Sequence, residues 1–227
     1  MLKHSCFLLA YIKYGDNDAI LHCFSREEGF QSFFIRGIYH PRNKKKAYLF
    51  PLNEIQLTFS GTNRKAIINV STIEQISSSY SIDVRTSTIL MFAADFLHQV
   101  LKEQGSDEKV YREIEIFLEN LYEGKINSYI VLVYRMLYHQ GISPLYSDHL
   151  FLNPEFGSFS AVQSHAFFDE KVSAVWKECA VNENLYDIIL KRDLRKCFLQ
   201  SLMIYYKMHF TGFYEPRSLE IIKEIYE

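Results

Sequence analysis

The 227-residue chain lacks the features of a secreted or membrane-spanning protein. Its four cysteines are widely separated and include no Cys-x-x-Cys pair, which favours buried reduced thiols over a disulfide framework or a zinc site. The apolar stretch Cys6–Ile12 is interrupted at Lys13 and has no small-residue cleavage site, so we expect neither a signal peptide nor a membrane span. These absences predict a soluble, cytoplasmic, globular protein.

The sequence also lacks the motifs on which common catalytic and phosphate-binding sites are built. It contains no Gly-x-x-x-x-Gly-Lys loop, Gly-x-Gly-x-x-Gly turn, Gly-x-Ser-x-Gly elbow or His-Glu-x-x-His helix. Asp16 and Asp18 are typical turn residues, whose short side chains bond their own backbone. A nuclease would need a carboxylate cluster for two-metal chemistry, and none is evident. We therefore expect no catalytic residue, no cofactor and no enzymatic activity.

Acidic residues are absent from one long stretch, residues 29–53. Five cations lie within eleven positions of it, in a chain of net charge −2: Arg36, Arg42, Lys44, Lys45 and Lys46. Residues 1–80 hold ten Lys and Arg against six Asp and Glu, a charge of +4, whereas residues 81–227 hold fifteen against twenty-one, a charge of −6. The N-terminal part is therefore suited to a polyanion, and elsewhere an anion contact has to be local.

The hydrophobic pattern changes near residue 80, where we predict a domain boundary. Before it, five short segments rich in aromatic and β-branched residues are typical of strands: Ser5–Lys13, Ala19–Ser25, Phe30–Ile38, Leu49–Phe59 and Ala66–Ile76. Five short strands in a small domain favour closure into a barrel, because closure removes exposed strand edges. Residues 1–80 are therefore predicted to form an OB-fold barrel.

Residues 81–227 are predicted to form an all-helical domain, which gives an α+β fold class with two domains. Apolar residues recur every three or four positions in seven segments: 86–104, 110–121, 129–138, 171–179, 185–189, 192–210 and 218–226. The interruption at 145–165 carries Pro, Gly and alternating aromatic residues, which indicates a loop or a small hairpin.

The order of short motifs resembles that of the bacterial recombination mediator family RecO, over essentially the whole chain. Near the N-terminus these motifs are Tyr14-Gly-Asp-Asn-Asp18, Arg36-Gly37 and Leu49-Phe-Pro-Leu-Asn53. Near the C-terminus they are Tyr205-Tyr-Lys-Met-His-Phe-Thr-Gly-Phe213 and the helix containing Ser218-Leu219. The resemblance implies a non-enzymatic, nucleoid-associated protein that binds single- and double-stranded DNA and anneals complementary strands. It also implies work with RecR, and in many bacteria RecF, in loading RecA onto DNA coated by single-strand-binding protein.

One departure from the family concerns zinc. Many members carry two zinc-binding cysteine pairs after the equivalent of Gly141-Ile-Ser-Pro144. Residues 145–165 contain no cysteine here, and Asp148, His149 and His165 do not supply the four ligands of a structural site. We predict a metal-free segment, as in the cysteine-free branch of the family.

The candidate DNA contacts in the barrel are cationic and aromatic. Arg36, expected at a strand end, and Arg42–Lys46, expected in a separate mobile loop, are candidates for phosphate contact, with a solvated loop as the alternative. Three flanking aromatic residues are candidates for base stacking or, alternatively, for the barrel core: Phe34, Tyr39 and Tyr48. The residues expected to form the core beneath them are Phe30, Phe33 and Ile35.

In the acidic part, one cluster places positive charge in the first turn of a helix, where it opposes the dipole: Lys191, Arg192, Arg195 and Lys196. Three roles are open for this cluster. It extends the DNA path, or it binds the acidic, aromatic-ended tail of single-strand-binding protein, as the resemblance suggests, or it is a solvated helix face. Phe198 and Leu199 are expected in the core. For the whole chain, the competing interpretation is an OB-fold interaction scaffold whose barrel binds RNA or an acidic protein.

Overall fold

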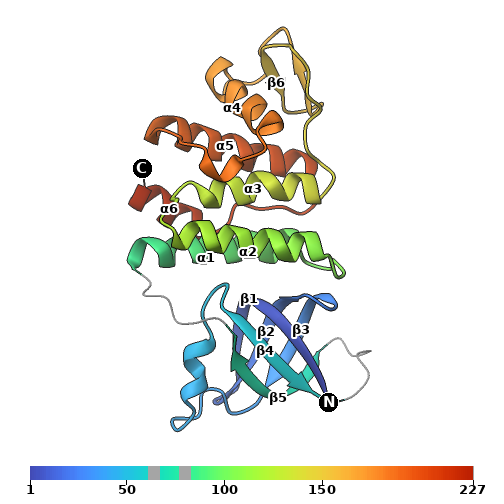
Figure 1. The fold of residues 1–227 in the computed structure, drawn as a ribbon, viewed down its shortest axis with the longest axis vertical. Coiled ribbons are helices and arrows are strands. Elements are labelled where there is room, and N and C mark those ends of the chain that lie inside the picture. The colour runs from blue at the N-terminus through green and yellow to red at the C-terminus, as the bar shows by residue number, and fades with distance from the viewer. Residues whose placement is uncertain (61–66, 77–82, 227) are drawn as a thin grey trace. The chain divides into compact units, whose positions relative to one another are not determined.

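The computed structural model describes residues 1–60, 67–76 and 83–226, and the chain divides into two compact units, Met1–Arg112 and Glu113–Glu227 (Figure 1). The division falls inside helix α2 (Glu108–Tyr122). Strands give way to helices near residue 80, but a domain boundary there stays a prediction. Residues 61–66 and 77–82, which contain the predicted boundary, lie outside the described residues.

The first unit contains a closed barrel whose strands follow the order β1-β2-β3-β5-β4, with β1 paired to β4. The strands are β1 (Leu2–Tyr14), β2 (Asp18–Ser25), β3 (Gly29–Ile35), β4 (Glu54–Phe59) and β5 (Ile68–Gln75). The β3–β5 pair is parallel and the other pairs are antiparallel. A five-stranded OB-fold barrel followed by helices confirms the predicted α+β fold class.

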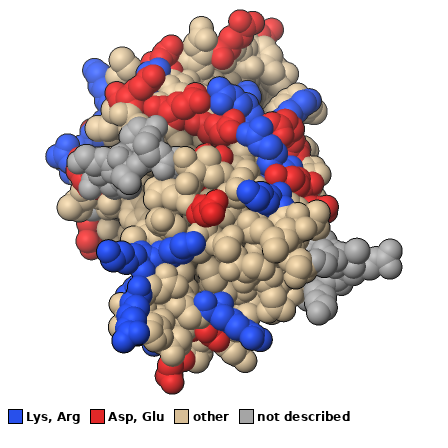
Figure 2. Space-filling model, turned by 60° about the horizontal axis from the view of Figure 1, so that its bottom comes forward, with Lys and Arg blue, Asp and Glu red and all other residues tan. Residues whose placement is uncertain are grey.

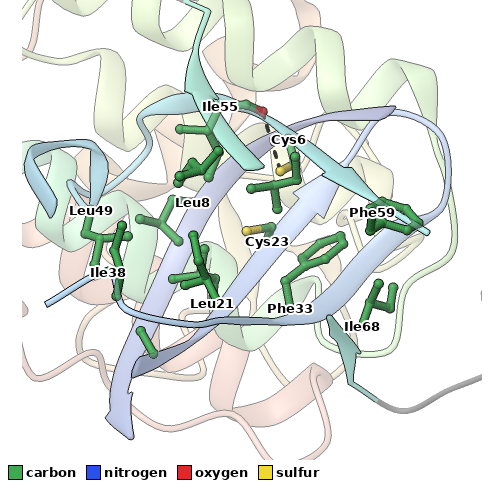
Figure 3. Close-up of a cluster of buried hydrophobic side chains, with 14 residues drawn as sticks. Cys6, Leu8, Leu21, Cys23, Phe33, Ile38, Leu49, Ile55, Phe59 and Ile68 are labelled. Carbon is green, nitrogen blue, oxygen red and sulfur yellow. Dashed lines mark hydrogen bonds between the residues drawn. The ribbon is translucent and has the colours of Figure 1, made fainter. Parts of the chain in front are cut away.

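Inward-facing side chains of the strands fill the barrel, and Figure 3 shows them converging from opposite walls. They include Phe33 and Ile35, as predicted, together with Cys6, Leu21, Cys23, Ile55 and Phe59. Cys6 Sγ donates a hydrogen bond to the carbonyl oxygen of Ile55 at 3.6 Å, and burial raises the pKa of this thiol. Cys197 is exposed, so the expectation of buried thiols is wrong for that residue.

Two predicted strand ends are wrong, and backbone conformation explains both. β3 ends at Ile35 rather than Ile38, because Gly37 turns the chain with a φ of 65°. β4 begins at Glu54 rather than Leu49, because Leu52 adopts a φ of 56°, which a strand does not allow. The segment between these strands contains a 3-10 helix, η1 (Lys44–Tyr48).

Helix α1 (Val84–Val100) covers one part of the outer surface of β1–β3. Asp83 caps the helix by accepting a hydrogen bond from the Thr86 amide at 2.7 Å. His98 Nε2 lies 3.2 Å from His22 Nδ1, and the ring of Phe30 is 5.7 Å from that of His98. Phe30 therefore packs outside the barrel beside α1, not in the core as expected. Ile12 and Tyr14, at the far end of β1, are exposed.

The second unit contains four further helices and a short hairpin. The helices are α3 (Ser128–His139), α4 (Glu170–Val181), α5 (Arg192–His209) and α6 (Leu219–Tyr226), with a 3-10 turn η2 (Leu185–Asp187). The hairpin pairs β6 (Phe151–Asn153) with β7 (Ser158–Ser160). No helix within the described ranges is long and apolar enough to cross a membrane.

A buried carboxylate ties three elements of the second unit together. Glu113 of α2 accepts hydrogen bonds from Arg135 Nε at 3.1 Å and from the Tyr186 hydroxyl at 2.8 Å, and His139 Nε2 lies 3.7 Å away. Burial opposes ionisation of Glu113, but His139, Tyr186 and Arg135 outweigh it and lower the pKa of the carboxyl. This cluster stabilises the unit without forming part of the candidate interface.

Candidate nucleic-acid interface on the barrel

The turn between β1 and β2 is bonded to the segment that follows β3. Asp18 Oδ1 accepts a hydrogen bond from the Gly37 amide at 2.8 Å, and the Tyr39 amide donates to the carbonyl oxygen of Asn17 at 2.8 Å. Two motifs that are separated in the sequence, Tyr14–Asp18 and Arg36-Gly37, therefore contact each other. This contact fixes the path of the chain into residues Arg42–Lys46, which we call the basic run.

The basic run, which the sequence predicted as a loop, extends into the 3-10 helix η1. Asn43 caps η1 by accepting from the Lys45 amide at 2.9 Å, and its Nδ2 donates to the carbonyl oxygen of Gly37 at 2.9 Å. Lys45 Nζ donates to the carbonyl oxygen of Ile73 in β5 at 2.9 Å. The ammonium group of Lys45 is thus used within the barrel, whereas Arg42, Lys44 and Lys46 are exposed.

Tyr39 lies between two cations. Lys46 Nζ is 5.4 Å and Lys13 Nζ 5.8 Å from the centre of its ring, both within the range of a cation–π contact. The ring also packs against the barrel core, and its burial raises the pKa of the Tyr39 hydroxyl. Tyr39 therefore holds two exposed lysines, one from β1 and one from η1, at the same place.

The three predicted stacking residues are all partly buried. Tyr39 and Tyr48 pack against the core, so they serve in part the alternative role that the sequence left open. Phe34 instead faces outward, and its ring meets that of Tyr14 edge-on at 5.6 Å. Tyr14 is 58% exposed and was missed as a site residue, although its position two residues after Ile12 in β1 places both on one side of the strand.

Cross-strand pairing aligns an apolar row on the outside of the barrel. Ile12 pairs with Ile20 and Ile20 with Phe34, so these side chains share the outer side of β1, β2 and β3. Tyr14 extends the row, and the exposed Arg36 follows Phe34 by two positions. We call Ile12, Tyr14, Ile20, Phe34 and Arg36 the outer wall.

Five exposed cations lie on or next to the elements around Tyr39 and the outer wall: Lys13 on β1, Arg36 after β3, and Arg42, Lys44 and Lys46 in and before η1. Figure 2 shows Lys and Arg side chains gathered in the lower part of the view, with few acidic side chains between them. Of the predicted barrel cations, Arg36, Arg42, Lys44 and Lys46 are exposed, Lys45 is bonded to β5, and Lys13 lies beside Lys46 at Tyr39. Sequence reasoning missed Lys13 because it stands alone, far from the basic run along the chain.

Comparison with known proteins gives a consistent result for the whole chain. A family model described as the N-terminal part of recombination protein O matches residues 1–79. A DNA repair protein RecO of Flavobacterium psychrophilum is 26% identical over 99% of both chains. Proteins of the same name from Flavobacterium johnsoniae and Azobacteroides pseudotrichonymphae are each 24% identical, over 99% and 100% of both chains. The chain is therefore similar to RecO proteins over its whole length. This similarity supports a role in DNA repair and recombination.

The second cationic cluster of the chain lies along one helix. Arg192, Arg195 and Lys196 fall on one side of α5, spaced three and four residues apart, and Lys191 is its N-cap. Arg195 Nη1 is 3.5 Å from Asn127 Oδ1, while Lys191, Arg192 and Lys196 are exposed. Phe198 and Leu199 are buried, which confirms their predicted place in the core: they are 1% and 2% exposed.

Residues 145–165, for which the sequence predicts a metal-free segment, contain the β6–β7 hairpin. In the described part of the chain, no three His, Cys, Asp or Glu side chains are placed to hold a metal ion. His165 Nδ1 accepts a hydrogen bond from the Phe167 amide at 3.2 Å, and its ring meets Phe168 edge-on. Asp148 and His149 are exposed.

Proposed function

We propose that this protein is a non-enzymatic recombination mediator that binds single- and double-stranded DNA through its barrel, residues 1–80, and anneals complementary strands. The observation that carries the proposal is the pair of exposed lysines held on Tyr39 beside the outer wall. Cations bind phosphates of any sequence, and exposed rings stack on bases that are not paired. Annealing requires both properties, because any two complementary strands have to be held with their bases accessible.

The two parts of this interface have different tasks. Lys13, Lys46 and the neighbouring exposed cations contact phosphates, and so contribute to the binding of single strands and of duplexes alike. Tyr14 and Phe34 form a platform for one or two bases, which a duplex keeps stacked inside its helix. Arg36, at the edge of the same wall, is placed to contact the adjoining phosphate.

The phosphate task is tested with a triple variant, Arg42→Ala/Lys44→Ala/Lys46→Ala. A control variant removes the same charge from exposed lysines elsewhere, Lys3→Ala/Lys109→Ala/Lys171→Ala. Fluorescence anisotropy with labelled oligonucleotides should show weaker binding of single strands and duplexes by the first variant only. For single strands, the slope of log K against log salt should fall by about 0.7 for each phosphate that the variant no longer neutralises. Equal binding by both variants would remove the basic run from the interface.

The stacking task is tested with Tyr14→Ala. We expect a loss of about 1–3 kcal/mol in binding to single-stranded DNA, with duplex binding unchanged. Annealing of complementary oligonucleotides, measured without nucleotide, should slow in parallel with the loss of single-strand affinity. An equal loss for duplex and single strand would contradict a platform for unpaired bases. Tighter binding of RNA of the same sequence would favour the alternative of a scaffold that binds RNA.

The proposed partners are RecR, single-strand-binding protein and, in some bacteria, RecF. With them the protein loads RecA onto DNA, and the proposed location is the cytoplasm. Similarity to RecO proteins supports this set. The α5 cluster offers exposed cations to an acidic tail, since Lys191, Arg192 and Lys196 all reach solvent. Changing these three to Ala should weaken binding of a peptide with the tail of single-strand-binding protein, measured by anisotropy. If DNA binding falls instead, the cluster belongs to the DNA path.

A further inference from the structure

The β6–β7 hairpin carries a group of exposed apolar side chains that the proposed DNA contacts do not use. Leu145 is 74%, Tyr146 53% and Phe156 77% exposed, and Leu150 and Val162 at the open end of the hairpin are 54% and 75% exposed. The Leu145 amide donates to the carbonyl oxygen of Gly157 at 2.7 Å, which places Leu145 and Tyr146 beside the turn that holds Phe156. We call these five residues the hairpin surface.

The hairpin surface is anchored from beneath by buried hydrogen bonds. The Leu152 amide donates to Ser173 Oγ of α4 at 3.0 Å, and His209 Nε2 of α5 lies 2.6 Å from the carbonyl oxygen of Pro154. A Cβ atom on Gly157 would come within 2.7 Å of the Tyr205 hydroxyl, so the turn is packed tightly on α5. The apolar side chains therefore belong to a surface formed before binding, which lowers the entropy cost when a partner docks.

Charge decides what kind of partner this surface fits. No Lys or Arg occurs between Met136 and Glu170, whereas Asp148, Glu155, Asp169 and Glu170 are exposed there. Phosphate binding needs cations, so this surface disfavours nucleic acid and anionic lipid. Lys177 of α4, in the same chain, contacts the hairpin surface. Its Nζ lies 5.9 Å from the ring centre of Tyr146 and 5.3 Å from that of Phe159.

We propose that the hairpin surface docks a protein segment that presents apolar side chains flanked by Lys or Arg. Phe156 and Leu145 are the anchors, because they are the most exposed large side chains beside the turn. Asp148 and Glu155 attract the flanking cations, which favours the correct partner over acidic proteins. This inference goes beyond the proposed DNA contacts and does not depend on them.

The test uses the full chain and two amphipathic peptides, one of leucine and lysine and one in which glutamate replaces every lysine. Calorimetric titration should show the lysine peptide binding at least about tenfold more tightly than the glutamate peptide. Leu145→Ser/Phe156→Ser should weaken lysine-peptide binding about tenfold or more. The matched control Val181→Ser/Ile189→Ser changes two apolar residues that are 63% and 90% exposed elsewhere in the same unit, and should bind like the parent.

Several results would overturn the proposal. Unchanged lysine-peptide binding by Leu145→Ser/Phe156→Ser would mean that the peptide binds elsewhere. Co-sedimentation with phosphatidylcholine vesicles that this variant abolishes would assign the surface to lipid. A concentration-dependent mass in sedimentation velocity that the variant abolishes would assign it to a second copy of the chain. Anisotropy with single-stranded DNA, run on the same variant, should match the parent, which separates this test from that of the DNA interface.

Discussion

Replacement of Gly29 by alanine should destabilise the barrel for two reasons, a conformational cost and a packing cost, and the structure allows each to be estimated. Gly29 begins β3 with a φ of 80°, and an added Cβ would lie 2.2 Å from the carbonyl carbon of Gly105 and 2.4 Å from the carbonyl oxygen of Gln104. The left-handed conformation costs alanine about 1 kcal/mol, and overpacking in a tight site adds about 1–3 kcal/mol. We therefore expect the free energy of unfolding to fall by roughly 2–4 kcal/mol.

Gly15→Ala is the matched control. Gly15 has a φ of 57° and no heavy atom within 4 Å of the position of an added Cβ, so its substitution carries the conformational cost alone. Urea unfolding is followed by far-ultraviolet circular dichroism for the whole chain and by fluorescence of Trp176, the single tryptophan, for the second unit. Equal destabilisation by Gly15→Ala and Gly29→Ala would refute the close approach of Gly29 to the 104–105 backbone.

Three further predictions concern titratable groups. Burial lowers the pKa of His22 and of His98 below 6.5. The folded chain then binds fewer protons than the unfolded one, so the free energy of unfolding should be highest above about pH 6.5 and fall as the pH drops below that value. In urea titrations between about pH 7 and 5, His98→Gln should make this fall smaller. Tyr186→Phe should cost about 1–2 kcal/mol of unfolding free energy, because Glu113 loses one hydrogen-bond donor; an unchanged midpoint of urea unfolding would contradict that bond. Cys197 is the exposed thiol, so Cys197→Ser should remove the fast phase of labelling by a disulfide reagent in the native protein.

The sequence was sufficient for the barrel because five segments rich in aromatic and β-branched residues precede the helices, and β4 alternates in polarity. Ile55, Leu57 and Phe59 all point into the core, as their spacing predicts. The ends of β3 and β4 were less predictable, because a positive φ at Leu52 is a tertiary outcome in a residue that does not favour it. Local pattern identifies an element more reliably than it fixes the last residue.

The candidate site was predictable in its charge but not in its geometry. The absence of acids from residues 29–53 correctly predicts a cationic surface, with Arg42, Lys44 and Lys46 exposed. The sequence could not show that the ammonium group of Lys45 donates to a carbonyl oxygen of β5, since that contact joins positions 28 residues apart. It could not select Tyr14 either, because exposure of the outer wall depends on which part of β1–β3 α1 covers.

Two stretches of this chain each exclude one sign of charge, and the structure assigns each stretch a different surface chemistry. Residues 29–53 hold no acid and place Lys46 on Tyr39, beside Lys13 of β1, while residues 136–170 hold no Lys or Arg and expose apolar side chains among carboxylates. A polyanion is attracted to the first and repelled by the second. A strand of DNA on the barrel therefore does not compete for the hairpin surface, and a cationic protein segment on the hairpin does not compete for the barrel. Under the two proposals, such segregation would let one small protein hold nucleic acid and a protein partner at the same time, as the proposed mediator role requires.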